Sequence, residues 1–191
     1  MAKSIPEPNL LSKLHRWAKA NRQDENFITE TFAHLLQYLL RIDRPTFGKE
    51  LIKKLAGIEL SSEECKEVKV TSQPTIFTRR KNKRRPDIKI SGDNIYVLVE
   101  VKVDAGLGES QLDDYLESFR ERSGDEESKL VLLTKRKITD QSKVPPEIKQ
   151  VRWEEIGEEL ARRKKATSKT GTEGYLVRQL LDFFISRGLY G

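Results

Sequence analysis

The chain has 191 residues, of which 35% are charged and 36% are hydrophobic, and its formal net charge is +6. This length is enough for one compact domain with a hydrophobic core. No run of about 18 apolar residues occurs, which excludes a membrane-spanning helix. A single cysteine, Cys65, excludes an internal disulfide framework, so we expect a cytoplasmic protein. Because the only histidines are His15 and His34, any metal is expected to be held by oxygen ligands.

The N-terminal part of the chain is predicted to be helical. Apolar residues at helical spacing predict an amphipathic helix over residues 9–20, inside an extension that covers residues 1–22. A longer helix ends near Arg41, and Glu25 lies under its apolar stripe whereas Glu30 points away. The Glu25 carboxylate either complements the helix dipole or reaches the carboxylates of the β-hairpin that follows later in the chain. A short helix over residues 46–57 follows.

The next segment predicts β-structure, with strands over residues 67–72 and 75–78 and then a β-hairpin. Ile88 and Ile90 alternate with polar residues, turn residues follow at 91–94, and an apolar strand begins at Tyr96. Glu100 and Lys102 are charges inside that strand and share one face. A loop at 92–93 pairs Asp87 with Leu98, and a loop at 93–94 pairs it with Glu100. Both registers place Asp87 on the Glu100 face.

The rest of the chain alternates helices and strands. A helix is expected over residues 110–121, and the continuous apolar run at 129–134 predicts a strand buried on both faces. Strand, helix and strand in this order imply a right-handed crossover and a parallel pair. A strand at 148–152, a helix at 153–165, a Ser/Thr/Gly-rich connection at 166–174 and an apolar C-terminal helix within 172–191 complete one α/β domain over residues 1–191. That last helix packs in the core by default, or alternatively serves a homodimer.

Basic residues are concentrated before the hairpin. A charge run is commonly a solvated loop, but this one leads directly into Pro86-Asp87, which favours a polyanionic ligand. The candidate phosphate-binding residues are Arg79, Arg80, Lys81, Lys83, Arg84 and Arg85.

The hairpin residues have the character needed for metal-dependent phosphodiester hydrolysis. The carboxylates of Asp87 and Glu100 could hold one or two hard divalent cations, and the backbone carbonyl of Val101 could supply another oxygen ligand. Such a cation acidifies a bound water and neutralises charge in the transition state. Lys102 would lie beside the attacking water as an electrostatic group, and its role as a base stays open.

Pro86-Asp87, twelve residues, and then Glu100-Val101-Lys102 resemble the PD-(D/E)xK motif of the restriction-endonuclease-like nuclease superfamily. Gln111 and Tyr115 resemble the QxxxY element of its RecB-like branches, whose side chains contact nucleic acid or support the site. Tyr115 could equally be a core aromatic. The segment around Glu25 resembles an N-terminal signature whose acidic residue completes the metal shell. The resemblance spans about residues 25–165.

This resemblance implies a restriction-endonuclease-like core, a central mixed β-sheet flanked by helices in the order αβββαβ. It implies a Mg²⁺-dependent nuclease, with Mn²⁺ as a substitute, acting on nucleic acid and by expectation on DNA. The main alternative is a catalytically inactive nuclease-like module that binds nucleic acid or serves as a scaffold. A third alternative is a structural protein whose charges pair on an exposed sheet.

Overall fold

The computed structural model describes residues 11, 24–42, 46–77, 83–103, 111–119, 127–136, 138, 144–166 and 171–191. The expected helix at 9–20 therefore lies almost entirely outside the described residues. The helices are α2 (Asp24–Arg41), α3 (Thr46–Ala56), α4 (Ser62–Glu67), α5 (Gln111–Phe119), α6 (Trp153–Ala166) and α7 (Thr172–Ser186). The strands are β1 (Lys69–Ser72), β2 (Ile76–Phe77), β3 (Lys83–Arg84), β4 (Ile88–Gly92), β5 (Ile95–Lys102), β6 (Glu127–Thr134) and β7 (Lys149–Arg152).

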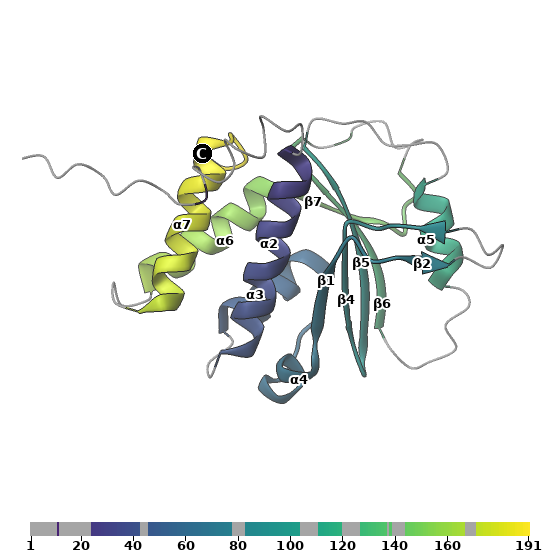
Figure 1. Ribbon diagram of the computed structural model, residues 1–191, viewed down its shortest axis with the longest axis horizontal. Coiled ribbons are helices and arrows are strands. Elements are labelled where there is room, and N and C mark those ends of the chain that lie inside the picture. The colour runs from purple at the N-terminus through teal and green to yellow at the C-terminus, as the bar shows by residue number, and fades with distance from the viewer. Residues whose placement is uncertain are drawn as a thin grey trace, which may run out of the picture.

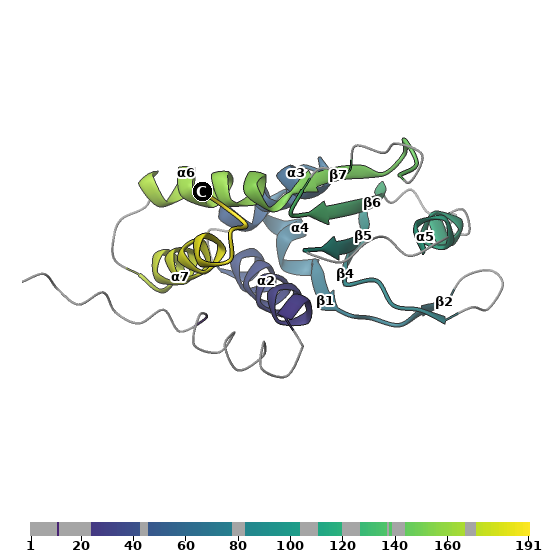
Figure 2. The same cartoon turned by 90° about the horizontal axis from the view of Figure 1, so that it is seen from above.

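A five-stranded sheet, in the order β1-β4-β5-β6-β7, forms the centre of the molecule. Helices α2, α3, α6 and α7 cover one face of this sheet, and α5 lies against the other (Figures 1 and 2). The strands β1, β4 and β5 pair antiparallel, whereas β5, β6 and β7 pair parallel. This confirms the predicted fold class, a mixed sheet flanked by helices, and the parallel pair joined through α5.

The β4–β5 hairpin adopts the second of the two predicted registers. Gly92 pairs with Ile95 across a turn at Asp93-Asn94, and the ladder ends where Ile88 pairs with Val99. Continuing that register by one residue brings Asp87 opposite Glu100. Strand alternation then assigns the two sheet faces to two cores. The odd-numbered valines of β5 join the core beneath α2, α3, α6 and α7, and Tyr96 and Leu98 join the core beneath α5.

Three aromatic residues join the helices of the larger core. The Trp153 ring meets Phe32 of α2 and Phe184 of α7 edge to face, with ring centroids 5.2 and 5.1 Å apart. Each such pair contributes about 0.5–1.5 kcal/mol beyond the area that it buries. The apolar stripe of α7 is therefore part of this core, as expected by default. Among the described residues, no helix is both long and apolar enough to cross a membrane.

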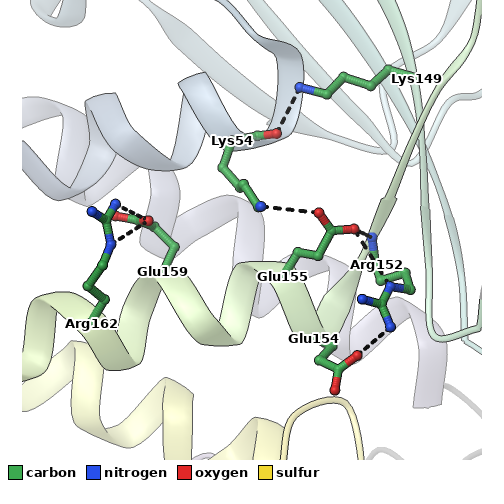
Figure 3. A network of polar contacts seen from close by, with 7 residues as sticks. All are labelled: Lys54, Lys149, Arg152, Glu154, Glu155, Glu159 and Arg162. Carbon is green, nitrogen blue, oxygen red and sulfur yellow. Dashed lines mark hydrogen bonds and ion pairs between the residues drawn. The ribbon is translucent and has the colours of Figure 1, made fainter.

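A polar network fastens α6 to α3 and β7 (Figure 3). The Lys149 Nζ donates a hydrogen bond to the Lys54 carbonyl near the end of α3, at 2.9 Å, where helix carbonyls lack intrahelical partners. The Lys54 ammonium lies 3.1 Å from Glu155, whose carboxylate also accepts from the Arg152 backbone N–H at the start of α6. The network fixes the edge strand β7 between two helices.

Helix α4 was not predicted, although the sequence carries its signature. The Ser61 side chain accepts from the Glu64 backbone N–H, and the Glu64 carboxylate accepts from the Ser61 N–H, which together form a capping box. The helix precedes β1, whose outer edge is covered by a side chain. Gln37 of α2 donates to the Val68 carbonyl at 3.2 Å and accepts from the Val70 N–H at 2.7 Å. The amide thus takes the place of a neighbouring strand.

The strands β2 and β3 form an arm that continues the β1–β4 ladder beyond the sheet (Figure 2). Ser72 pairs with Ile88 in the sheet, Phe77 pairs with Lys83 in the arm, and the register does not slip between them. Gln73 lies at the junction with φ of 45°, a left-handed conformation that is uncommon for a residue with a side chain. Its backbone N–H donates to the Asp87 carbonyl at 2.7 Å. The arm therefore begins at Asp87.

Candidate active site

Glu100 and Lys102 lie at the carboxyl end of β5, on the face that α5 covers. The Glu100 side chain is only 2% exposed, and its Oε1 lies 2.6 Å from the Lys102 Nζ. A buried carboxylate is costly unless a positive group and hydrogen bonds compensate its charge. Lys102 supplies that positive charge at a point where the lysine itself is still partly open to solvent. In a structural protein whose charges pair on an exposed sheet, both partners of the pair would lie in solvent. The pair of Glu100 and Lys102 differs, because Glu100 is buried.

Asp87 approaches the same end of β5 from the neighbouring strand. Its Oδ2 accepts a hydrogen bond from the Val101 backbone N–H at 2.8 Å. This bond holds the Asp87 carboxylate at Val101, the residue between Glu100 and Lys102 in the strand. The half-buried Asp87 follows Pro86, where the chain leaves the arm and enters β4.

Glu25, near the start of α2, reaches this end of β5 as well. Its Oε2 accepts from the Val103 backbone N–H at 2.9 Å, one residue beyond Lys102. Glu30 faces a different partner, since its carboxylate accepts from the Ser72 hydroxyl at 2.6 Å and lies 3.6 Å from His34. The structure thus brings Glu25, and not Glu30, to the carboxylates of the hairpin.

Tyr115 of α5 lies beneath the site. Its hydroxyl donates to the Glu100 Oε2 at 3.2 Å, and the side chain is 1% exposed. A side chain this buried offers little surface to nucleic acid, and its bond to Glu100 fits the other role that the resemblance implies, support of the site. The alternative expectation, a core aromatic whose hydroxyl is satisfied nearby, describes what is seen. Gln111 is the first residue of α5, and its side chain lies outside the described part.

The charges at this site are unbalanced. Burial, followed by the charge of Glu100, raises the pKa of Asp87 from 3.8 to about 7, against the opposing Val101 hydrogen bond and the Lys102 charge. Burial lowers the pKa of Lys102, but the hydrogen bond and charge of Glu100 outweigh it and raise that pKa above 10.5. Lys102 is therefore an ammonium at neutral pH, and Asp87 is held close to the point where it takes up a proton.

This donor set fits a hard divalent cation. In the described part of the chain, the carboxylates of Asp87, Glu100 and Glu25 lie near the Lys102 ammonium, and burial followed by the charge of Glu100 raises the pKa of Asp87. Among the described residues, no three His, Cys, Asp or Glu side chains lie close enough to hold an ion by themselves. Asp87 and Glu100 could therefore hold such an ion only with further oxygens, for which the Val101 carbonyl, water and substrate phosphate are the available sources.

The six basic candidates have different surroundings. Arg79, Arg80 and Lys81 lie outside the described residues. Lys83 and Arg85 are exposed, and Arg85 donates to the side chain of Gln73. Arg84 is half-buried, and its Nε donates to the Asp114 carboxylate of α5 at 2.7 Å. Arg84 thus anchors the arm to α5, which leaves its guanidinium less available to phosphate than the run of charges suggested.

Asp114 is a further residue near the site that the sequence did not single out, and Asn26 was noted only together with Glu25 in the N-terminal signature. Asp114 pairs with Arg84, and the side-chain Oδ1 of Asn26 accepts from the Gln73 side-chain amide at 2.8 Å. Both contacts join segments far apart in the chain. The only sequence signal for Asn26 was its place next to Glu25.

A sequence model described as the PD-(D/E)XK nuclease superfamily matches residues 12–179. The match extends beyond the span of about residues 25–165 expected from the motifs and includes the first half of α7. Neither curated proteins nor solved structures gave a match.

Proposed function

Because the chain belongs to the PD-(D/E)XK nuclease superfamily, we propose that it is a Mg²⁺-dependent nuclease that hydrolyses phosphodiester bonds of DNA. One observation carries the proposal. Asp87, Glu100 and Lys102 converge at the end of β5, and the Asp87 carboxylate is fixed by the Val101 N–H. A module that only binds nucleic acid has no need for a buried and a half-buried carboxylate beside an ammonium, because they repel phosphate.

Each residue has a distinct part in the proposed reaction. Asp87, Glu100 and the Val101 carbonyl hold the cation. When bound, Mg²⁺ or Mn²⁺ supplies an acidified water and positive charge against the developing negative charge of the phosphate. Lys102, whose pKa is raised above its ordinary value, is a positioned ammonium that would stabilise charge on the phosphate oxygens.

Two further residues hold this arrangement in place. Tyr115 fixes one oxygen of Glu100 while Lys102 lies against the other. Glu25 accepts from the Val103 N–H, which orders the end of β5, and it adds negative charge that favours the cation. In this proposal the Glu25 carboxylate completes the metal shell through a bound water, since no third carboxylate lies close enough to Asp87 and Glu100 among the described residues to bind the same ion directly.

The substrate is expected to be a polyanion because the chain is basic and its cations gather beside the site. The net charge is +6, and Lys83 and Arg85 lie on the arm that starts at Asp87. Affinity should fall with salt, with a log–log slope of about −0.9 for each phosphate neutralised on duplex DNA.

The test is a cleavage panel with circular, linear and single-stranded DNA, each incubated with Mg²⁺, Mn²⁺ or EDTA. The variants are Asp87→Ala, Glu100→Ala and Lys102→Ala. Matched controls are Asp93→Ala, an exposed acid at the turn of the same hairpin, and Lys69→Ala, an exposed lysine on β1. The proposal expects metal-dependent cleavage that the three site variants lose and both controls retain, with circular dichroism spectra unchanged.

Full activity in the Asp87 and Glu100 variants would refute the assigned site. DNA binding by the wild-type chain without cleavage under any condition of the panel would instead favour the inactive binding module.

A further inference from the structure

The arm formed by β2 and β3 has two faces of opposite character. Ile76 is buried and packs with Tyr96, Leu98 and Tyr115 in the core beneath α5. Phe77, the next residue, must point the other way because strand side chains alternate. It is 67% exposed, the most of any large hydrophobic side chain in the described part of the chain. One face therefore anchors the arm, and the other presents an aromatic ring.

Other exposed aromatic residues have neighbours that account for them. Tyr38 and Tyr175 line an apolar groove of about 310 Å³ between α2 and α7, together with Leu11 and Leu35. A single exposed apolar residue is common on protein surfaces. What distinguishes Phe77 is the charge beside it.

Phe77 shares its face with a lysine. Lys83 is its directly paired residue on β3, so both side chains lie on the same side of the ribbon, and Lys83 is exposed. Arg84 points to the opposite side, where it pairs with Asp114. The anchoring face thus has its cation neutralised by an acid, and the face with the aromatic ring carries Lys83.

The arm lies close to Asp87, the proposed catalytic carboxylate. Asp87 lies four residue steps along the chain from Lys83, so their Cα atoms are at most about 14 Å apart. Arg85 lies between them and is tied to Gln73, whose backbone bonds Asp87.

We infer that Phe77 is a stacking platform for an unpaired base, so that the substrate is nucleic acid with a single-stranded segment beside the scissile phosphate. Aromatic rings bind single strands by stacking on bases, with cations along the backbone. In intact duplex DNA the bases are already stacked, so the ring has no free base to cover. This inference rests on the proposed nuclease function and specifies its substrate class.

The experiment measures binding by the full chain in EDTA, which suppresses metal-dependent cleavage. The probes are a fluorescein-labelled single-stranded oligonucleotide, a blunt duplex of the same sequence, and that duplex with a single-stranded overhang. The variants are Phe77→Ala, Phe77→Leu and Phe77→Trp. Ile185→Ala is the matched control, since it removes an exposed apolar side chain on α7.

Loss of stacking on one base should weaken binding of the single-stranded and overhang probes by about 5- to 150-fold in Phe77→Ala. Phe77→Leu should lose a similar factor, because leucine is apolar but not planar. Phe77→Trp should retain affinity, and its added indole emission should be quenched by the single-stranded probe. Blunt-duplex affinity and the salt slope should be unchanged, as should all binding by Ile185→Ala.

An unchanged affinity in Phe77→Ala, equal losses on blunt and single-stranded probes, or wild-type affinity in Phe77→Leu would each overturn the inference. Retained affinity in Phe77→Leu would point to apolar docking instead of stacking. These outcomes leave the cleavage panel untouched, so failure of the stacking role is distinguishable from failure of the nuclease proposal. If the relative cleavage rates of the different substrates were the same for Phe77→Ala as for the wild type, this result would also count against the stacking role.

Discussion

Asp87→Asn should stabilise the protein when no divalent cation is present. The wild-type carboxylate is half-buried and faces Glu100 and Glu25, and its pKa is raised from 3.8 to about 7. Asparagine is neutral and retains a carbonyl oxygen that can accept from the Val101 N–H, as the Asp87 Oδ2 does at 2.8 Å. The substitution thus removes the unfavourable charge and preserves the hydrogen bond.

The sign of the pH dependence follows from linkage. A folded pKa above the unfolded value means that the folded state keeps a proton which the unfolded state releases. Stability at this residue is therefore greatest below about pH 4 and is lost as pH rises to about 7. Three pKa units correspond to roughly 4 kcal/mol as an upper limit. Partial exposure and coupling to Glu100 reduce the expected gain for Asp87→Asn at pH 8 to about 1–2 kcal/mol.

The assay is thermal unfolding in EDTA at pH 8 and pH 5.5. A gain of this size should raise Tm by about 2–8 °C at pH 8 for a chain of this length, and the difference from wild type should shrink at pH 5.5. Added Mg²⁺ should stabilise the wild type more than the variant, because the cation compensates a charge that only the wild type carries. Asp93→Asn, at the exposed turn, is the matched control. A variant equally or less stable than wild type at pH 8 in EDTA would refute the reasoning.

Two further substitutions test contacts around the site and the sheet. Tyr115→Phe removes the hydroxyl that bonds Glu100, so it should lower the cleavage rate about 10- to 100-fold and the stability by about 1 kcal/mol. Steady-state kinetics with Tyr38→Phe as the control measure this effect. An unchanged rate would exclude the positioning role. Gln37→Ala leaves the Val68 carbonyl and the Val70 N–H at the edge of β1 without their side-chain partner. The free energy of unfolding, measured in urea, should fall by about 1–3 kcal/mol. No loss relative to the control His34→Ala, on the same helix, would contradict this prediction.

The hairpin could be predicted from the sequence because its determinants are local. Alternation of apolar and polar residues defined β4 and β5, and turn residues at 91–94 limited the loop to few positions. Both registers with a two-residue loop, at 92–93 or at 93–94, placed Asp87 and Glu100 on one face. The structure selects the Asp93-Asn94 turn, with Gly92 opposite Ile95.

The arm could not be predicted as a hairpin, since its second strand has no apolar alternation. Lys83 and Arg84 lie inside a basic run, and their strand conformation is set by pairing with Phe77 and Ile76. The same run hid the difference between Arg84, which pairs with Asp114, and its neighbours. The charges in a sequence show the sign of a segment's net charge, but they do not show which of its residues are already paired with an opposite charge.

Glu25 shows a third limit, that of long-range contacts. Helical periodicity placed it under the apolar stripe and Glu30 outside it, and the structure has Glu25 at the end of β5 and Glu30 at Ser72. Periodicity could not show that the acceptor would be the Val103 N–H, because 78 residues separate the two. Tyr115 has the same ambiguity, since its spacing allowed both a surface contact and the buried bond to Glu100 that is observed.

Asp87 occupies the point where the sheet ends and the arm begins, which couples the proposed chemistry to the proposed substrate contact. The Gln73 N–H bonds the Asp87 carbonyl, while the Gln73 side chain bonds both Arg85 of the arm and Asn26 of α2. Asn26 adjoins Glu25, which holds the end of β5. Gln73, one residue in a left-handed conformation, thus contacts the arm, Asp87 and α2 together. A conformation of that kind persists only where its surroundings fix it, and here they are the two segments that the site requires.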